Sequence, residues 1–229
     1  TEISSWDRPE IQVLARKQAK SQQSAEKTQI DIGQEGDRVW VKTKYTSEGD
    51  WLSWLNWKQP APVDYVVQVP RQCEINASTV SGKTTIQDIK NTVKQKTVSG
   101  KAHLENIQGK ISLNSVSGDI SAENLEGEVK LNTVSGDVVL QASDLVALKG
   151  NTVSGDIRAE TALDAQGHYH VSSVSGDLRL TVPPGTSCTA KLSTISGDLR
   201  TDLPHEIIED KRTAKRFRVN GGGVSLDMN

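Results

Sequence analysis

The chain has 229 residues, of which 34% are hydrophobic and 4% aromatic, so it offers few large apolar side chains for a compact globular core. Its 27 basic and 29 acidic residues nearly cancel and are scattered along the chain, which excludes the concentrated basic surface of a typical nucleic-acid-binding protein. No apolar run is long enough to cross a membrane, and the sequence therefore predicts no transmembrane segment.

Residues 1–72 read as β-structure without a regular period. Runs of alternating or β-branched residues favour strands at residues 10–14, 28–32, 38–42 and 63–69. We interpret this segment as irregular first rungs that cap a regular repeat, because the open end of a strand stack exposes unpaired backbone groups.

A tryptophan-rich stretch at residues 49–60 interrupts these strands and contains Trp51, Trp54 and Trp57, three of the five tryptophans in the chain. The spacing of Trp51 and Trp54 suits a short helical turn. The stretch is either a hydrophobic lid on the strands or an exposed aromatic patch for a protein, a glycan or a lipid headgroup layer. In the second case, the three tryptophans are the candidate partner-binding residues.

The region 73–203 contains an internal repeat, which is the strongest signal in the sequence. Seven copies of the motif Thr/Ser-Val/Ile-Ser-Gly-Asp/Lys occur in it, at steps of 18 to 21 residues. The glycines of the seven copies are Gly82, Gly100, Gly118, Gly136, Gly155, Gly176 and Gly197. A repeat of this length predicts a stack of similar structural units.

Apolar residues keep fixed positions relative to each glycine of the repeat. Ile120 and Ala122 follow Gly118 with period two, and four other copies show the same pattern, so these repeats begin with a strand that has one buried face. Further glycines at Gly109 and Gly127 mark a second turn. The sequence therefore predicts an all-β fold, a single-stranded β-solenoid (β-helix) of 18–21-residue rungs with irregular β caps. We expect a right-handed coil, although no residue pattern fixes the hand.

Residues 204–229 are expected to close the other end of the stack. A final strand pair is predicted at residues 216–219 and 223–228. We interpret residues 1–72, 73–203 and 204–229 as one continuous domain.

These motifs resemble a bacterial adhesin-like family of uncharacterised β-strand-repeat proteins. The resemblance rests on the repeated Thr-Val-Ser-Gly-Asp motif, on the N-terminal run Trp-Asp-Arg-Pro-Glu-Ile-Gln-Val and on a Val-Pro strand before the first copy. It covers nearly the whole chain and implies a β-helix in an exported or envelope-associated protein. The adhesin label of that family is itself an inference, so the resemblance implies no functional residue.

An aspartate follows the glycine in five of the repeats, and these residues are the first candidate site. They are Asp119, Asp137, Asp156, Asp177 and Asp198. Carboxylates stacked at the inter-strand spacing of ~4.8 Å could bind Ca²⁺ along one edge. The interpretation we favour is structural: each carboxylate accepts a hydrogen bond from its own turn and faces water. Lys83 and Lys101 replace the aspartate in the first two copies, which weakens any carboxylate site there.

Two other groups of residues suggest chemistry. Asp156 with Arg158, or Asp177 with Arg179, could serve a carbohydrate-active enzyme, but such pairs are also typical of a solvated sheet face. His168 and His170 share a strand face and could ligate a metal, yet no third ligand has a suitable spacing. We therefore expect no catalytic residue, no metal and no cofactor.

The two cysteines, Cys73 and Cys188, each precede a repeat glycine by nine residues. Equal positions in different rungs lie far apart along the stack, beyond the ~7 Å between Cα atoms that a disulfide allows. We predict two buried free thiols.

The function we favour is a non-catalytic binding or scaffold module of the bacterial cell envelope, with an unidentified protein or glycan partner. The alternative is a structural β-solenoid that self-assembles through rung pairing, and a carbohydrate-active enzyme is third. A location in the periplasm or at the cell surface follows from the family resemblance alone. Because the chain begins with Thr1 and not with Met, we expect that an upstream segment was removed.

Overall fold

The computed structural model describes residues 1–45, 61–193, 204–211 and 214–229. The tryptophan-rich stretch at 49–60, with Trp51, Trp54 and Trp57, lies outside the described residues, as does Asp198. Strands contain 76% of the residues and helix only 2%, which confirms the all-β solenoid prediction. The chain divides into two compact units, Thr1–Pro70 and Arg71–Asn229.

The unit Thr1–Pro70 consists of short strands and one helical turn. Its elements are β1 (Glu2–Trp6), β2 (Gln12–Lys17), α1 (Gln22–Glu26), β3 (Thr28–Glu35), β4 (Arg38–Tyr45) and β5 (Val63–Pro70). The strand β5 pairs in parallel with β1 and antiparallel with β2, while β3 and β4 form a separate hairpin. The strands predicted in this segment are present, although with different bounds.

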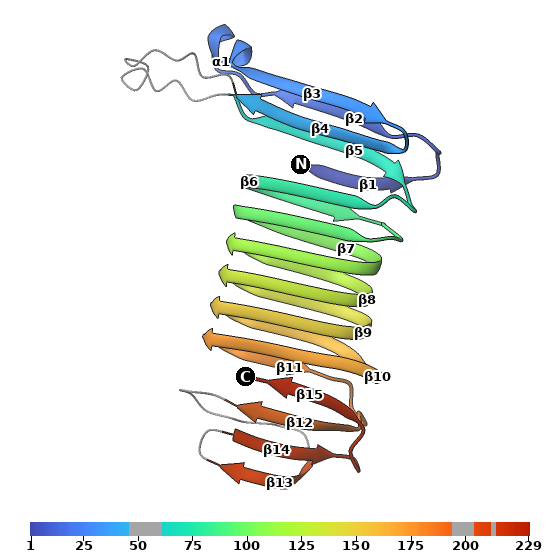
Figure 1. The fold of residues 1–229 in the computed structure, drawn as a ribbon, viewed down its shortest axis with the longest axis vertical. Helices are drawn as coiled ribbons and strands as arrows, with labels where there is room; N and C mark the ends of the chain where they lie inside the picture. Colours follow the sequence, from blue (N-terminus) through green and yellow to red (C-terminus); the bar gives the residue numbers. More distant parts are fainter. Residues whose placement is uncertain (46–60, 194–203, 212–213) are drawn as a thin grey trace. The chain divides into compact units, whose positions relative to one another are not determined.

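The unit Arg71–Asn229 contains the regular stack, which Figure 1 shows as successive coils from β6 to β10. Its first strands are β6 (Ile75–Gln87), β7 (Val93–Ser117), β8 (Ile120–Ser135), β9 (Val138–Ser154), β10 (Ile157–Ser175) and β11 (Leu178–Thr181). Each long strand pairs in parallel with the next at the register of the repeat, so that Ile120 lies beside Val138 and Val138 beside Ile157. Like residues therefore stack on like residues.

The core of this unit is a set of apolar columns, one residue per rung. Leu104, Ala122 and Leu140 form one column, and Leu113 and Leu131 belong to another; all five are at most 1% exposed. A buried leucine in such a column is worth about 2–5 kcal/mol relative to alanine. The low content of apolar residues is sufficient because each rung contributes only one inward side chain to each column of this narrow core.

The longer repeats place their extra residues at the second turn. The register shifts between Gly127 and Glu128 where β8 meets β9, and again between Leu163 and His168 where β10 meets β9. Tyr169 fills this irregular region, and its hydroxyl accepts a hydrogen bond from the Asp164 N–H at 2.7 Å and donates one to the Leu145 carbonyl. Burial raises the pKa of Tyr169. The strands after the turn return to register.

The glycines of the repeat allow adjacent rungs to approach closely at one corner. At Gly136 the backbone has a φ of +126°, and a Cβ atom there would lie 2.6 Å from the carbonyl oxygen of Gly118. Both the conformation and the contact require glycine. The valine of each motif points outward instead: Val98, Val116, Val134 and Val153 are about half exposed, whereas the preceding Thr or Ser is buried in those rungs.

The C-terminal strands do not follow the expected order. They are β12 (Cys188–Ser193), β13 (His205–Lys211), β14 (Ala214–Val219) and β15 (Val224–Met228). The last strand, β15, lies between β10 and β12 and pairs in parallel with both. The predicted pairing of residues 216–219 with 223–228 is wrong, because β12 separates β14 from β15. The prediction that rungs stack in chain order up to residue 203 is wrong at the same point.

Candidate functional site

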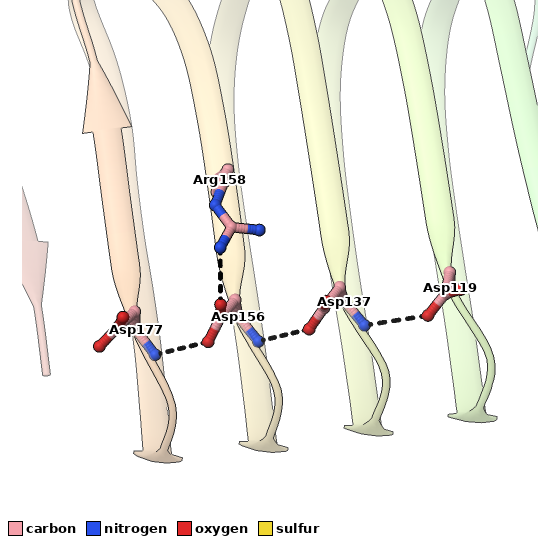
Figure 2. Close-up of polar contacts among 5 residues, drawn as sticks. All are labelled: Asp119, Asp137, Asp156, Arg158 and Asp177. Atoms are coloured by element: carbon pink, nitrogen blue, oxygen red, sulfur yellow. Dashed lines mark hydrogen bonds and ion pairs between the residues drawn. The ribbon is translucent and has the colours of Figure 1, made fainter.

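The aspartates of the repeat form a hydrogen-bonded ladder at the glycine corner (Figure 2). The carboxylate of Asp119 accepts a hydrogen bond from the backbone N–H of Asp137 at 3.4 Å. Asp137 accepts in the same way from Asp156 at 3.1 Å, and Asp156 accepts from Asp177 at 2.9 Å. The sequence predicted bonds within each turn, and this detail is wrong: the donor belongs to the next rung.

Basic side chains occupy further carboxylate oxygens of the same ladder. Arg158 Nη2 lies 2.8 Å from Asp156 Oδ2, so both oxygens of Asp156 have a partner. Lys101, one of the two lysines that replace the aspartate, lies 3.2 Å from Asp119. Within the described ranges, no group of three or more His, Cys, Asp or Glu side chains could hold a metal ion. The ladder joins the rungs. Most of its carboxylate oxygens are used in these hydrogen bonds and ion pairs, so few remain to bind a ligand at the corner.

A groove on another face of this unit has a volume of about 650 Å³. Its floor is formed by the buried column Ile111, Val129, Leu148 and Tyr169. Because side chains alternate along a strand, the residues on either side of this column point outward. The groove is therefore a trough between two columns of outward side chains.

The register identifies the two columns that flank the trough, and both cross β7, β8, β9, β10 and β15. The first contains Lys110, Glu128, Ala147, His168 and Ser225. The second contains Ser112, Lys130, Lys149, His170 and Asp227. We call this feature the lysine groove. In these columns His170 lies beside Lys149 on one side and Asp227 on the other. The two histidines with this carboxylate still do not form a group that could hold a metal ion, as judged over the described residues.

Lysines on the groove differ in their partners. Lys94 lies 2.8 Å from Glu74, and Lys110 lies 3.4 Å from Glu128, so these two charges are compensated. In the described part of the chain, Lys130 and Lys149 have no carboxylate within ion-pair distance. They are in-register neighbours on the same face of the sheet, and both are exposed. Two like charges thus lie side by side in the middle of the groove.

The lysine groove was not predicted from the sequence, although the sequence contains a signal for it. Lys130, Lys149 and His170 each precede a repeat glycine by six residues, so they share one position of the rung. Aligning the repeats by their glycines places the three in one column. The contribution of β15 could not be found in this way, because residues 224–228 carry no repeat motif.

Both cysteines are free thiols, but only Cys188 is buried; Cys73 is half-buried, so the prediction of two buried thiols is wrong for Cys73. Burial raises the pKa of each thiol, and Glu74 adds to the effect at Cys73. Cys188 pairs with Val224 and Val219. Neither thiol contributes to the groove.

Comparisons with known proteins identify a family. The model of the family described as Toastrack DUF4097 matches residues 2–223. No curated protein and no solved structure matches the chain. None of the helical segments in the described part of the chain has the length and apolar character needed to cross a membrane.

Proposed function

This chain belongs to the Toastrack DUF4097 family, and from that premise we propose that it is a non-catalytic binding module of the bacterial cell envelope. The β-solenoid fold supports a structural or scaffold role, because stacked rungs present a long surface of fixed geometry. The lysine groove is the surface that engages the partner.

The observation that carries this proposal is the contrast between the satisfied ladders and the open groove. Asparagine side chains bond from rung to rung, with Asn132 donating to Asn114 at 3.1 Å and Asn151 donating to Asn132 at 3.0 Å. Together with the aspartate ladder, these bonds fix the rungs relative to one another. A groove on such a stack is preorganised, and preorganisation lowers the entropy lost on binding.

Asp156, one of the two carboxylates that could serve catalysis, supports a binding role. Asp156 uses one oxygen for the Asp177 N–H and the other for Arg158, so it is a poor general base.

The alternative is a structural protein that assembles end to end by rung pairing. The outer strand at the C-terminal end of the stack is β13, a strand antiparallel to β14. It carries the charged residues Glu206, Glu209, Asp210 and Lys211. Charged edge strands oppose pairing with another chain. These charges disfavour pairing at this end of the stack, although β13 also exposes Ile207 and Ile208, and on balance they support the binding module.

Fractionation of the native cells tests the location. With periplasmic, membrane and cytosolic marker proteins as controls, an antibody should detect the chain in the envelope fractions. Detection in the cytosol alone would contradict the proposed location.

Incubation of the purified protein with envelope glycans, followed by mass spectrometry, should yield no new products. Turnover of any glycan would support the enzyme alternative, and growth of particle size with concentration would support self-assembly.

A further inference from the structure

The lysine groove contains a charge arrangement that the fold does not require. Lys130 and Lys149 are direct neighbours in the parallel pairing of β8 and β9. Adjacent strands lie ~4.8 Å apart, and like charges directly opposite each other destabilise a sheet. In the neighbouring column of the same face, Lys110 lies opposite Glu128 and forms an ion pair with it. A glutamate could therefore occupy the position of one of the two lysines.

The surroundings of the two lysines make the site accessible. Ala147 lies between Glu128 and His168 in the neighbouring column, so a small side chain faces the lysine pair. Ser112 and His170 extend the lysine column on its two sides. The chain as a whole has a net charge of −2, so the lysine pair is a local positive site on an acidic protein. An anion bound between the lysines would relieve their repulsion.

We propose that the lysine groove binds an acidic polysaccharide, with its carboxylate or sulfate groups paired to Lys130 and Lys149. Ser112, His168 and His170 supply hydrogen bonds to the hydroxyl groups of the same chain. The bound polymer runs across the strands, along the columns, because the two charges lie on successive rungs. This assignment rests on the proposed binding function and specifies the chemistry of its partner.

Two other polyanions fit the groove less well. An extended acidic peptide gains affinity by adding a strand to a sheet edge, but the floor of the groove is the face of a sheet whose strands are already paired. Single-stranded nucleic acid is held by stacking its bases on aromatic rings. Among the described lining residues, the one Phe, Tyr or Trp side chain is Tyr169, which is 2% exposed and so offers no large stacking surface. A polysaccharide needs neither a free edge nor an aromatic platform.

The test is isothermal titration of the full chain with four polymers: polygalacturonate, heparin, neutral dextran and single-stranded DNA. The double variant Lys130→Gln/Lys149→Gln removes the proposed contacts. The matched control is Lys83→Gln/Lys101→Gln, which removes the same charge from the glycine corner. A third variant, Ala147→Leu, fills the groove without changing charge. Because all four lysines lie on the surface, circular dichroism should show an unchanged fold.

We expect the wild-type chain to bind polygalacturonate, heparin or both, and the preferred polymer identifies carboxylate or sulfate as the bound group. Loss of two charge-assisted contacts should weaken that binding about tenfold or more in the groove double variant. The corner control should bind as the wild type does, and Ala147→Leu should bind more weakly.

Three results would overturn the inference: no binding of either acidic polymer, equal binding by the groove double variant, or DNA bound as tightly as the polysaccharides. Dextran bound by all variants would overturn the charge assignment and leave the proposed binding function intact. The cell fractionation and the glycan incubation test two other parts of the proposed function, the location and the absence of turnover, whatever polymer the groove binds.

Discussion

At the glycine corner, the carboxylates of Asp119, Asp137 and Asp156 each accept a hydrogen bond from the next rung. In the lysine groove, Lys130 and Lys149 occupy neighbouring rungs, and no carboxylate of the described residues lies within ion-pair distance of either. The aspartates lie in the turns between consecutive strands and the two lysines lie on β8 and β9, and both sets follow the register of the same stack. In both regions the repeat places identical residues on neighbouring rungs. At the corner the stacked aspartates form hydrogen bonds between rungs, whereas the stacked lysines repel each other. The difference separates residues that hold the stack together from residues available to a partner.

The largest expected effect comes from the corner itself. Gly136→Val introduces a Cβ that would lie 2.6 Å from the Gly118 carbonyl oxygen, at a φ of +126°. Backbone strain alone costs about 1–3 kcal/mol, and the clash adds to it, so we expect a loss of about 3 kcal/mol or more by urea unfolding.

Gly82→Val is the matched control for this substitution. Gly82 has a φ of +104°, but nothing lies within 4 Å of its added Cβ. It should lose only the strain contribution, about 1–3 kcal/mol. Equal losses at the two glycines would mean that close approach of the rungs contributes nothing.

The asparagine ladder should show an intermediate effect. Asn132→Ala removes the donor to Asn114 and the acceptor of Asn151, so each of these two half-buried amides loses one of its hydrogen bonds. We expect a loss of about 1–3 kcal/mol in the free energy of unfolding. Lys96→Ala changes an exposed residue four positions before Gly100, as Asn132 is before Gly136, and should be nearly neutral. If Asn132→Ala leaves the free energy of unfolding unchanged, the asparagine ladder does not stabilise the fold.

A smaller effect is expected at the aspartate ladder. Asp137→Ala removes the acceptor of the Asp156 N–H and should cost about 0.5–1.5 kcal/mol. Asp137→Asn retains an acceptor oxygen and should cost less. If the ladder instead bound Ca²⁺, adding the ion at a hundred times its Kd would stabilise the protein by about 2.7 kcal/mol. We expect no such rise in thermal unfolding experiments.

The smallest effect has the opposite sign. Lys149→Glu places a carboxylate beside Lys130 and reproduces the arrangement of Lys110 and Glu128, so it should stabilise the protein by about 0.2–1 kcal/mol. Lys110→Glu places two carboxylates in register and should destabilise it by a similar amount. Both changes are measurable in urea at low salt, and 1 M salt should reduce them. A destabilising Lys149→Glu would show that the lysine pair serves the fold.

The repeat predicted the β-solenoid because one short rung cannot bury enough apolar surface to fold alone, so stacking is the only stable outcome. It also predicted the columns: residues at a fixed distance from the repeat glycine, such as Val129 and Leu148, share one buried column in the structure. Lys130 and Lys149 could have been placed together by the same reasoning.

The bulges at the second turn decide where the extra residues of the longer repeats go, and the sequence leaves several places open. Residues 145–147 and 163–168 absorb the insertions, which keeps Lys149 and His170 in register with Lys130. The extra residues come before Lys149 and His170 in the chain. The distance from each of these two residues to its repeat glycine is therefore unchanged at six residues. The groove columns therefore survive a change in repeat length.

By itself, the sequence determined the strand character, the period and the inward face, since these depend on residue spacing within one rung. Only the tertiary structure decided the partners of the terminal strands. Cys188 has the position of a repeat residue, yet β12 pairs with β14 and β15 and not with β10. Any strand with alternating apolar residues can pair with an open edge, so neighbours there are chosen by the energy of the whole assembly.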